Sequence, residues 1–143
     1  MWAAGDYTND LTDITTGQAG QKISISKEYS YNGDYSYKIF RDPSENNLLW
    51  TLFNFPQTTL IDEIYELRFN VLLVSGTVDF WFGESVSNGL RSSTRLNGEN
   101  TNTTIVLSRT ITSSTNTLQL RVNSVTDNVI LFIDNINIVK MNL

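Results

Sequence analysis

The sequence predicts an all-β protein, a two-sheet antiparallel β-sandwich of the jelly-roll type with about eight to nine strands. Apolar and polar residues alternate with period 2 in several short segments rich in β-branched and aromatic residues. Gly, Asn, Asp and Ser cluster between these segments, as is typical of turns. Strands do not alternate with capped amphipathic helices, so a parallel α/β sheet is not predicted.

The predicted strands are separated by turn residues. Asn32 and Gly33 form a strong turn signal before the second strand, and Pro56 is expected to end the third. Ser75 and Gly76 separate the fourth strand from the fifth. The strands are predicted over 22–26, 35–40, 48–55, 64–74, 77–83, 103–112, 117–125 and 129–140.

Helix signals are confined to single turns, one at 57–64 and one at 85–90. The polar stretch 83–104 is predicted to be a long loop, which could hide a short edge strand around 91–96. We interpret Met1 as a start placed before an internal segment of a longer protein. Residues 1–20 are expected to form an N-terminal segment, part of the domain or a linker to it, and residues 21–143 the β-sandwich.

The composition argues against several function classes. The net charge is −5 and there is no Lys/Arg cluster to neutralise phosphates, so neither nucleic acid nor an anionic membrane surface is an expected partner. No apolar run approaches the roughly 20 residues of a membrane helix, so no membrane insertion is predicted. Cysteine and histidine are absent from the sequence, which removes thiol chemistry and the commonest general base. Ser85 lies in GESVS, which lacks the last glycine of a G-x-S-x-G elbow, and no enzyme is predicted.

The alternation assigns side chains to faces. Successive residues of a strand point to opposite sides, so the apolar set lies inward and the polar set outward. The outward set mixes carboxylate, guanidinium and amide groups with one indole, a composition typical of a sugar-binding platform. The inward residues are Tyr65, Leu67, Phe69, Val71, Leu73, Val78, Phe80, Phe82, Leu118, Leu120 and Val122; the outward residues are Glu66, Arg68, Asn70, Asp79, Trp81, Gln119, Arg121 and Asn123.

Four segments resemble the galactose-binding-like jelly-roll carbohydrate-binding modules, which are appended to glycoside hydrolases and surface proteins. GDYSYKI at 33–39 is similar to their G-x-Y-S-L-K-I strand, and IDNINI at 133–138 to their closing I-D-D/N-I-x-I strand. Between them, IYELRFNVLLVSGTVDFWFG at 64–83 is similar to a hairpin of the family, which implies a hairpin here, and TITSSTNTLQLRV at 110–122 is similar to a later segment. The resemblance covers the chain from about residue 21 onward. It implies a nine-strand jelly roll that binds glycans on a concave face or at loop tips, in an extracellular or cell-surface protein.

The same resemblance implies a structural calcium ion between the N-terminal segment and the closing strand. The closing-strand aspartate maps onto Asp134, while Asp6, Asp10 and Asp13 are candidates for the N-terminal acidic ligand. Backbone carbonyls near Asn32 or Gly33 would complete the site. Calcium suits such a set because it takes six to eight oxygen ligands. The alternative is that the Asp134 carboxylate accepts hydrogen bonds from backbone amides.

Trp81 and Trp50 are the aromatic candidates for sugar stacking, because the negative face of an indole attracts the C–H edge of a pyranose. For Trp81 the platform and plain packing remain equally open. For Trp50, with apolar residues on both sides of its strand, packing in the core is favoured. Planar polar groups could bind vicinal hydroxyls, or form a solvated face with cross-strand ion pairs such as Arg68 with Asp79. These polar candidates are Arg68, Glu66, Asn70, Asp79, Gln119 and Arg121.

The sequence therefore predicts a non-catalytic module that binds an oligosaccharide or a cell-wall or surface polysaccharide by aromatic stacking and polar contacts. The alternative is a structural or adhesion domain of a surface protein or virus tail, which would contact protein partners. Few aromatic residues are predicted to be exposed, and this keeps the alternative open.

Overall fold

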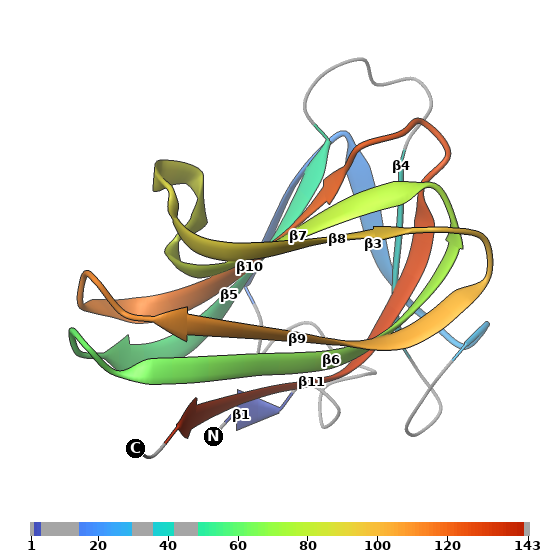
Figure 1. The fold of residues 1–143 in the computed structure, drawn as a ribbon. Coiled ribbons are helices and arrows are strands. Elements are labelled where there is room, and N and C mark those ends of the chain that lie inside the picture. Colours follow the sequence, from blue (N-terminus) through green and yellow to red (C-terminus); the bar gives the residue numbers. More distant parts are fainter. Residues whose placement is uncertain (1, 4–14, 30–35, 42–48, 142–143) are drawn as a thin grey trace.

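The computed structural model describes residues 2–3, 15–29, 36–41 and 49–141. Figure 1 shows these residues as a β-sandwich in which nearly every segment is a strand. The strands and the single 3₁₀ turn of this part are β1 (Trp2–Ala3), β2 (Thr15–Ala19), β3 (Gln21–Ser26), β4 (Ser36–Arg41), β5 (Trp50–Thr59), β6 (Ile64–Ser75), β7 (Thr77–Ser85), η2 (Val86–Asn88), β8 (Leu90–Asn97), β9 (Thr101–Thr110), β10 (Thr115–Ser124) and β11 (Ile130–Met141).

The strands form two antiparallel sheets, here called sheet A and sheet B. Sheet A has the order β3-β4-β11-β6-β9, and β1 pairs with β11 beyond the end of β4. Sheet B has the order β2-β5-β10-β7-β8. From β5 to β11 the chain passes repeatedly from one sheet to the other, which is the jelly-roll connection. The predicted all-β jelly-roll sandwich is confirmed, with β1 and β2 added to the predicted strands.

The core lies between the two sheets and is built by the predicted alternation. Every residue predicted to face inward from β6, β7 and β10 is buried, including the aromatic ones. Aromatic pairs connect the layers: the rings of Phe69 on β6 and Phe80 on β7 meet edge to face, with centroids 5.0 Å apart. Tyr37 on β4 and Phe53 on β5 make a second such contact at 5.7 Å. Such contacts add to the burial of apolar area that holds the sheets together.

The expected hairpin between the fourth and fifth strands is wrong. Gly76 turns the chain from β6 in sheet A to β7 in sheet B. Its φ of +92° lies in the left-handed region, and a Cβ there would meet Thr126 Oγ1 and Val129 Cγ2 at 2.8 Å. Glycine is therefore required at this corner.

Two further local expectations are wrong. Pro56 does not end its strand, since β5 continues to Thr59, and there is no helical turn at 57–64. Proline is tolerated there because the pairing with β10 is irregular beside Pro56, and among the described residues β2 pairs with β5 as far as Asn54. The second expected turn is confirmed by η2, and the edge strand hidden in the polar stretch is confirmed by β8.

Candidate functional site

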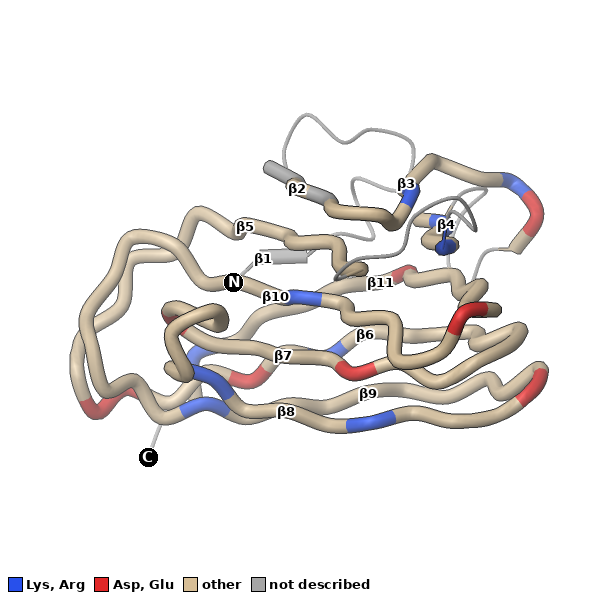
Figure 2. The backbone as a smooth tube through the Cα atoms, turned by 90° about the horizontal axis from the view of Figure 1, so that it is seen from above, with Lys and Arg blue, Asp and Glu red and all other residues tan. Residues whose placement is uncertain are grey.

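The outer face of sheet B carries a regular grid of polar and aromatic side chains. Strand register sets the rows, because paired residues of neighbouring strands point to the same side. One row runs Leu52, Arg121, Trp81, Ser93, and the next runs Trp50, Asn123, Asp79, Arg95. A third row runs Asn54, Gln119, Gly83, Arg91. Figure 2 shows the strands of this sheet side by side, with arginines marked in blue on β10 and β8.

Two tryptophans and two arginines stack on one another across this grid. The guanidinium carbon of Arg91 lies 3.7 Å from the centroid of the Trp81 ring. The guanidinium carbon of Arg121 lies 5.0 Å from the Trp81 ring and 4.9 Å from the Trp50 ring. All these distances are within the range of cation–π attraction. We call the surface formed by Trp50, Trp81, Arg91 and Arg121 the tryptophan–arginine face.

The favoured expectation that Trp50 packs in the core is wrong. The structure places its indole half-buried on the outer side of sheet B, in register with Asn123. The indole lies beside β2, where a Cβ on Gly17 would be in ordinary van der Waals contact with its six-membered ring, at 3.5 Å. The apolar residues on both sides of Trp50 in the sequence concealed this, because Leu52 also points outward.

Hydrogen bonds fix the polar side chains of the grid. Arg121 Nε donates to Asn123 Oδ1 at 2.8 Å, and Arg121 Nη1 donates to Ser87 Oγ at 3.3 Å. Gln119 Nε2 donates to Asn54 Oδ1 at 3.0 Å, while Gln119 Oε1 accepts from the backbone amide of Val86 at 3.2 Å. The network ties η2 to the sheet and holds Arg121 between the two indoles.

The carboxylate of Asp79 is paired within sheet B rather than with Arg68. Asp79 accepts two hydrogen bonds from Arg95, at 2.7 Å from Nε and 2.9 Å from Nη2. The expected cross-strand pair of Arg68 with Asp79 is wrong, because the two residues belong to different sheets.

The predicted ligand residues of β6 lie on the other side of the molecule. Glu66, Arg68 and Asn70 point outward from sheet A, where Arg68 Nη2 donates to Glu66 Oε1 at 3.0 Å. Asn70 Nδ2 donates to Thr104 Oγ1 at 2.9 Å. The structure therefore brings Trp81, Trp50, Asp79, Gln119 and Arg121 together and separates them from the residues of β6.

Asp134 lies on the outer side of sheet A, in register with Asn70, and is fully buried. One carboxylate oxygen accepts the Asn135 backbone amide at 2.7 Å, at a bulge where Asn135 has a φ of +56°. A buried carboxylate in an apolar strand fits a ligand for a hard cation. In the part of the chain that the structure describes, no three acidic side chains gather round it. The other predicted ligands, Asp6, Asp10, Asp13, Asn32 and Gly33, lie outside the described residues.

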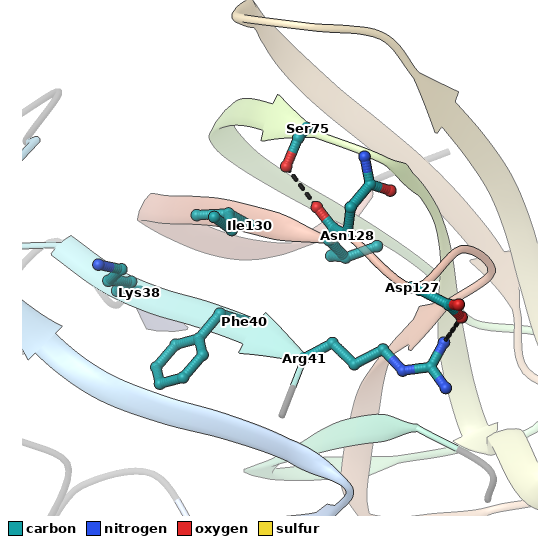
Figure 3. A pocket seen from close by; sticks show the side chains of 8 residues that line it. Lys38, Phe40, Arg41, Ser75, Asp127, Asn128 and Ile130 are labelled. Atoms are coloured by element: carbon teal, nitrogen blue, oxygen red, sulfur yellow. Dashed lines mark hydrogen bonds and ion pairs between the residues drawn. The ribbon is translucent and has the colours of Figure 1, made fainter. Parts of the chain in front are cut away.

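A cavity of about 340 Å³ opens on sheet A, where the end of β4 meets the turn before β11. Figure 3 shows its polar groups turned toward one another: Arg41 pairs with Asp127, and Ser75 Oγ donates to the Asn128 carbonyl. Lys38, at its other side, pairs with Glu28 at 2.9 Å. These contacts occupy the groups that could bind a polar ligand, so the cavity is a weaker candidate than the tryptophan–arginine face.

Two arginines, Arg91 and Arg109, make contacts that were not predicted from the sequence. Arg91 was hidden in the stretch interpreted as a loop, and only the β7–β8 pairing brings it beside Trp81. Arg109 on β9 pairs with Glu84 on β7 and so joins the two sheets, with Nε–Oε1 at 2.6 Å. Their separation in the sequence left no local signal for either contact.

Within the described residues, no helix is long and apolar enough to cross a membrane. The architecture and its exposed face define the class: a jelly-roll β-sandwich with an aromatic and polar surface on one sheet.

Neither a protein-family model nor a curated protein matches this chain. Many solved structures do. The xylan-binding CBM22-1 domain of Paenibacillus barcinonensis Xyn10C has a TM-score of 0.61 and 17% identity, covering 91% of this chain and 86% of that one. TmCBM61, solved with β-1,4-galactotriose, has a TM-score of 0.60 and 13% identity over 94% of this chain and 93% of that one.

A bacteriophage protein is also similar. The enzymatically active domain of bacteriophage CBA120 tailspike protein 4 has a TM-score of 0.71 and 12% identity. The match covers 96% of this chain but 20% of that chain. The matching structures are mostly carbohydrate-binding modules, which confirms the predicted resemblance at the level of the fold.

Proposed function

We propose that this chain is a non-catalytic carbohydrate-binding module, and that the tryptophan–arginine face of sheet B holds an oligosaccharide or polysaccharide. The observation that carries the proposal is the stacking of Trp50, Arg121, Trp81 and Arg91 on the outer face of a single sheet. A flat row of this kind suits an extended polymer better than a small compact ligand.

Each group on the face has a chemical role in sugar binding. Indole faces attract the C–H edges of sugar rings, and guanidinium, amide and carboxylate groups bind pairs of hydroxyls. Because Arg91 and Arg121 stack on Trp81, that indole also orients two sets of hydrogen-bond donors. Gln119 and Asn54 extend the polar surface along the strands. All of these contacts are non-covalent, as a binding module requires.

The experiment is affinity electrophoresis of the chain on a panel of soluble neutral and acidic polysaccharides. Trp50→Ala and Trp81→Ala should each weaken binding at least tenfold, or about 1.4 kcal/mol. The first removes a stacking surface, and the second removes the ring that positions Arg91 and Arg121. Val106→Ala is the matched control, because Val106 is 44% exposed and points outward from the opposite sheet. Thermal melts of all variants verify that they fold.

The proposal is supported if the polysaccharide retards the wild type and Val106→Ala but neither tryptophan variant. Equal retention of Trp50→Ala, Trp81→Ala and wild type would move the site elsewhere on the molecule. A chain that no polysaccharide on the panel retards would contradict glycan binding.

The alternative, a structural or adhesion domain, is favoured by one surface feature. Leu60 and Ile61 at the tip after β5 are 63% and 59% exposed, and such neighbouring apolar side chains suit contact with another protein. The likeness to part of a phage tailspike is consistent with it. On either proposal the chain belongs to a larger extracellular or cell-surface protein.

A further inference from the structure

The outer face of sheet B is positively charged, although the chain as a whole has a net charge of −5. Strand register places Arg91, Arg95 and Arg121 on this face. On the five strands of the sheet as described, Asp79 is the outward carboxylate, and it is bound by Arg95. The charges of Arg91 and Arg121 are thus in excess on this face.

Arg91 and Arg121 also keep N–H donors that form no hydrogen bond among the described residues. A guanidinium has five N–H donors. Arg91 donates Nη1 to the Val86 carbonyl, and Arg121 donates one bond to Asn123 and one to Ser87. Among the described residues neither forms an ion pair. Stacking on an indole leaves the in-plane N–H groups of a guanidinium directed outward from the ring.

The two guanidinium groups are close enough to repel each other. Both of their carbon atoms lie within 5.0 Å of the centroid of one Trp81 ring. Burial lowers the pKa of Arg121, and the neighbouring charge of Arg91 lowers it further. An anion bound near both groups would relieve this repulsion and accept hydrogen bonds from their unused donors.

A third group on the same face lacks a partner. Asn123 Nδ2 is buried without a hydrogen bond among the described residues, although Asn123 Oδ1 accepts from Arg121. Asn123 lies in the row between Trp50 and Asp79. A ligand oxygen would supply the missing acceptor if it displaced the side chains that cover this amide.

We propose that the ligand of the tryptophan–arginine face is an acidic polysaccharide, whose sugar units carry an oxyanion that Arg91 and Arg121 bind together. This inference rests on the proposed function and names the substrate class of the same site. The shared chemistry is a carboxylate or a sulfate group on a sugar ring, since arginine binds both through paired N–H groups.

The test compares polymers that differ in charge but keep their sugar backbone. Binding of the full chain is measured by calorimetry against polygalacturonate and alginate, against their carboxyl-reduced neutral forms, and against chondroitin sulfate. Poly-L-glutamate controls for charge without sugar. Arg91→Gln and Arg121→Gln remove one charge each, and Arg68→Gln is the matched control on the outer face of sheet A.

We expect an acidic polymer to bind, its neutral form to bind at least tenfold more weakly, and binding to fall as salt rises. Each of Arg91→Gln and Arg121→Gln should weaken binding at least tenfold, and Arg68→Gln should leave it unchanged. Chondroitin sulfate carries uronate carboxylates as well as sulfate. Binding of polygalacturonate or alginate therefore identifies the carboxylate as sufficient, and binding of chondroitin sulfate alone identifies the sulfate.

Equal affinity for the acidic and neutral forms, or binding of neutral polymers alone, would overturn this inference and leave the proposed function standing. Poly-L-glutamate that binds as tightly as the polysaccharides would overturn it as well. Failure of every polymer, neutral and acidic, would overturn both. Thermal melts verify that the variants fold. The salt dependence of the wild type verifies that its binding is electrostatic.

Discussion

At the scale of single residues, the partner of each charged side chain determines its role. Arg95 and Arg68 are exposed and pair with the partly buried carboxylates of Asp79 and Glu66, and such pairs near the surface contribute little to stability. Arg91 and Arg121 have indoles instead and remain available to a ligand. Glu84 differs again, because its side chain is 1% exposed and its partner Arg109 comes from the other sheet.

Glu84 is held by several donors at once. Besides Arg109, its Oε2 accepts the backbone amides of Thr112 and Ser113 at 3.0 Å and 3.3 Å. Burial raises the pKa of this carboxyl, but hydrogen bonds from Arg109 and the Thr112 amide lower the pKa by more, so its net direction is downward. The ionised form is therefore the one that joins the two sheets.

Glu84→Gln should lower the free energy of unfolding by about 3 kcal/mol at pH 7, since it leaves the Arg109 charge without its partner. Because the folded-state pKa of Glu84 is depressed, its contribution is complete above the unfolded value of about 4.3 and disappears as the pH falls through the folded pKa. Urea unfolding of both proteins between pH 7 and pH 3 measures the difference.

Glu66→Gln is the control, because its exposed pair with Arg68 should contribute less than about 1 kcal/mol at any pH. A Glu84→Gln deficit as large at pH 3 as at pH 7 would show that shape, not charge, makes Glu84 important.

At the scale of secondary-structure elements, the β7–β8 pair builds the site. β8 is an edge strand of eight residues with a polar, alternating sequence, and pairing with β7 carries Arg91 to Trp81. The two backbones approach closely at Gly83: a Cβ there would lie 2.0 Å from the Leu90 carbonyl oxygen and 2.8 Å from Arg91 Cα. Gly83 is therefore a spatial requirement of the site.

Gly83→Ala should destabilise the chain by more than about 2 kcal/mol and weaken glycan binding, because the added methyl group displaces β8 and Arg91 with it. Gly89→Ala is the comparison: nothing lies within 4 Å of its Cβ position, and its φ of +83° alone makes alanine unfavourable, by about 1 kcal/mol. Urea unfolding and binding to the same polymer measure both effects. Binding by Gly83→Ala equal to that of Gly89→Ala would show that the β8 position does not affect the site.

At the scale of the whole molecule, the two outer faces of the sandwich carry different side chains. The outer face of sheet B carries the tryptophan–arginine face, and the outer side of sheet A carries the buried Asp134 beside Asn70. The calcium ion predicted at Asp134 would lie on the side opposite the glycan, so we expect it to stabilise the fold without taking part in binding.

Removing calcium with EDTA should therefore lower the Tm and leave the glycan affinity of the folded chain unchanged. Calcium at a hundred times its Kd would stabilise the fold by about 2.7 kcal/mol, roughly 5–10 °C in Tm for a domain of this size. Asp134→Asn should abolish the response to calcium, and Asp79→Asn should retain it. A wild-type Tm that EDTA does not move would contradict the calcium site.

The sequence alone determined which side chains of each strand point inward and which outward. The period of 2 is a local property, visible along β6 and β7 without knowing their neighbours. It also sufficed for the all-β class and the candidacy of Trp81, whereas the jelly-roll resemblance came from motifs such as those at 33–39 and 133–138. The hairpin expected at Gly76 and the strand end expected at Pro56 were wrong because both depend on what the rest of the chain packs against them.

Only the tertiary structure decided which residues share a face. In a sandwich, outward means two opposite directions, and the sheet that a strand joins is set by pairing between distant segments. Arg68 and Asp79 therefore separate, although 11 positions apart, whereas Trp50 and Arg121 meet from β5 and β10. Arg91 reaches Trp81 because β8 is an edge strand of sheet B, a pairing that its own polar sequence does not specify.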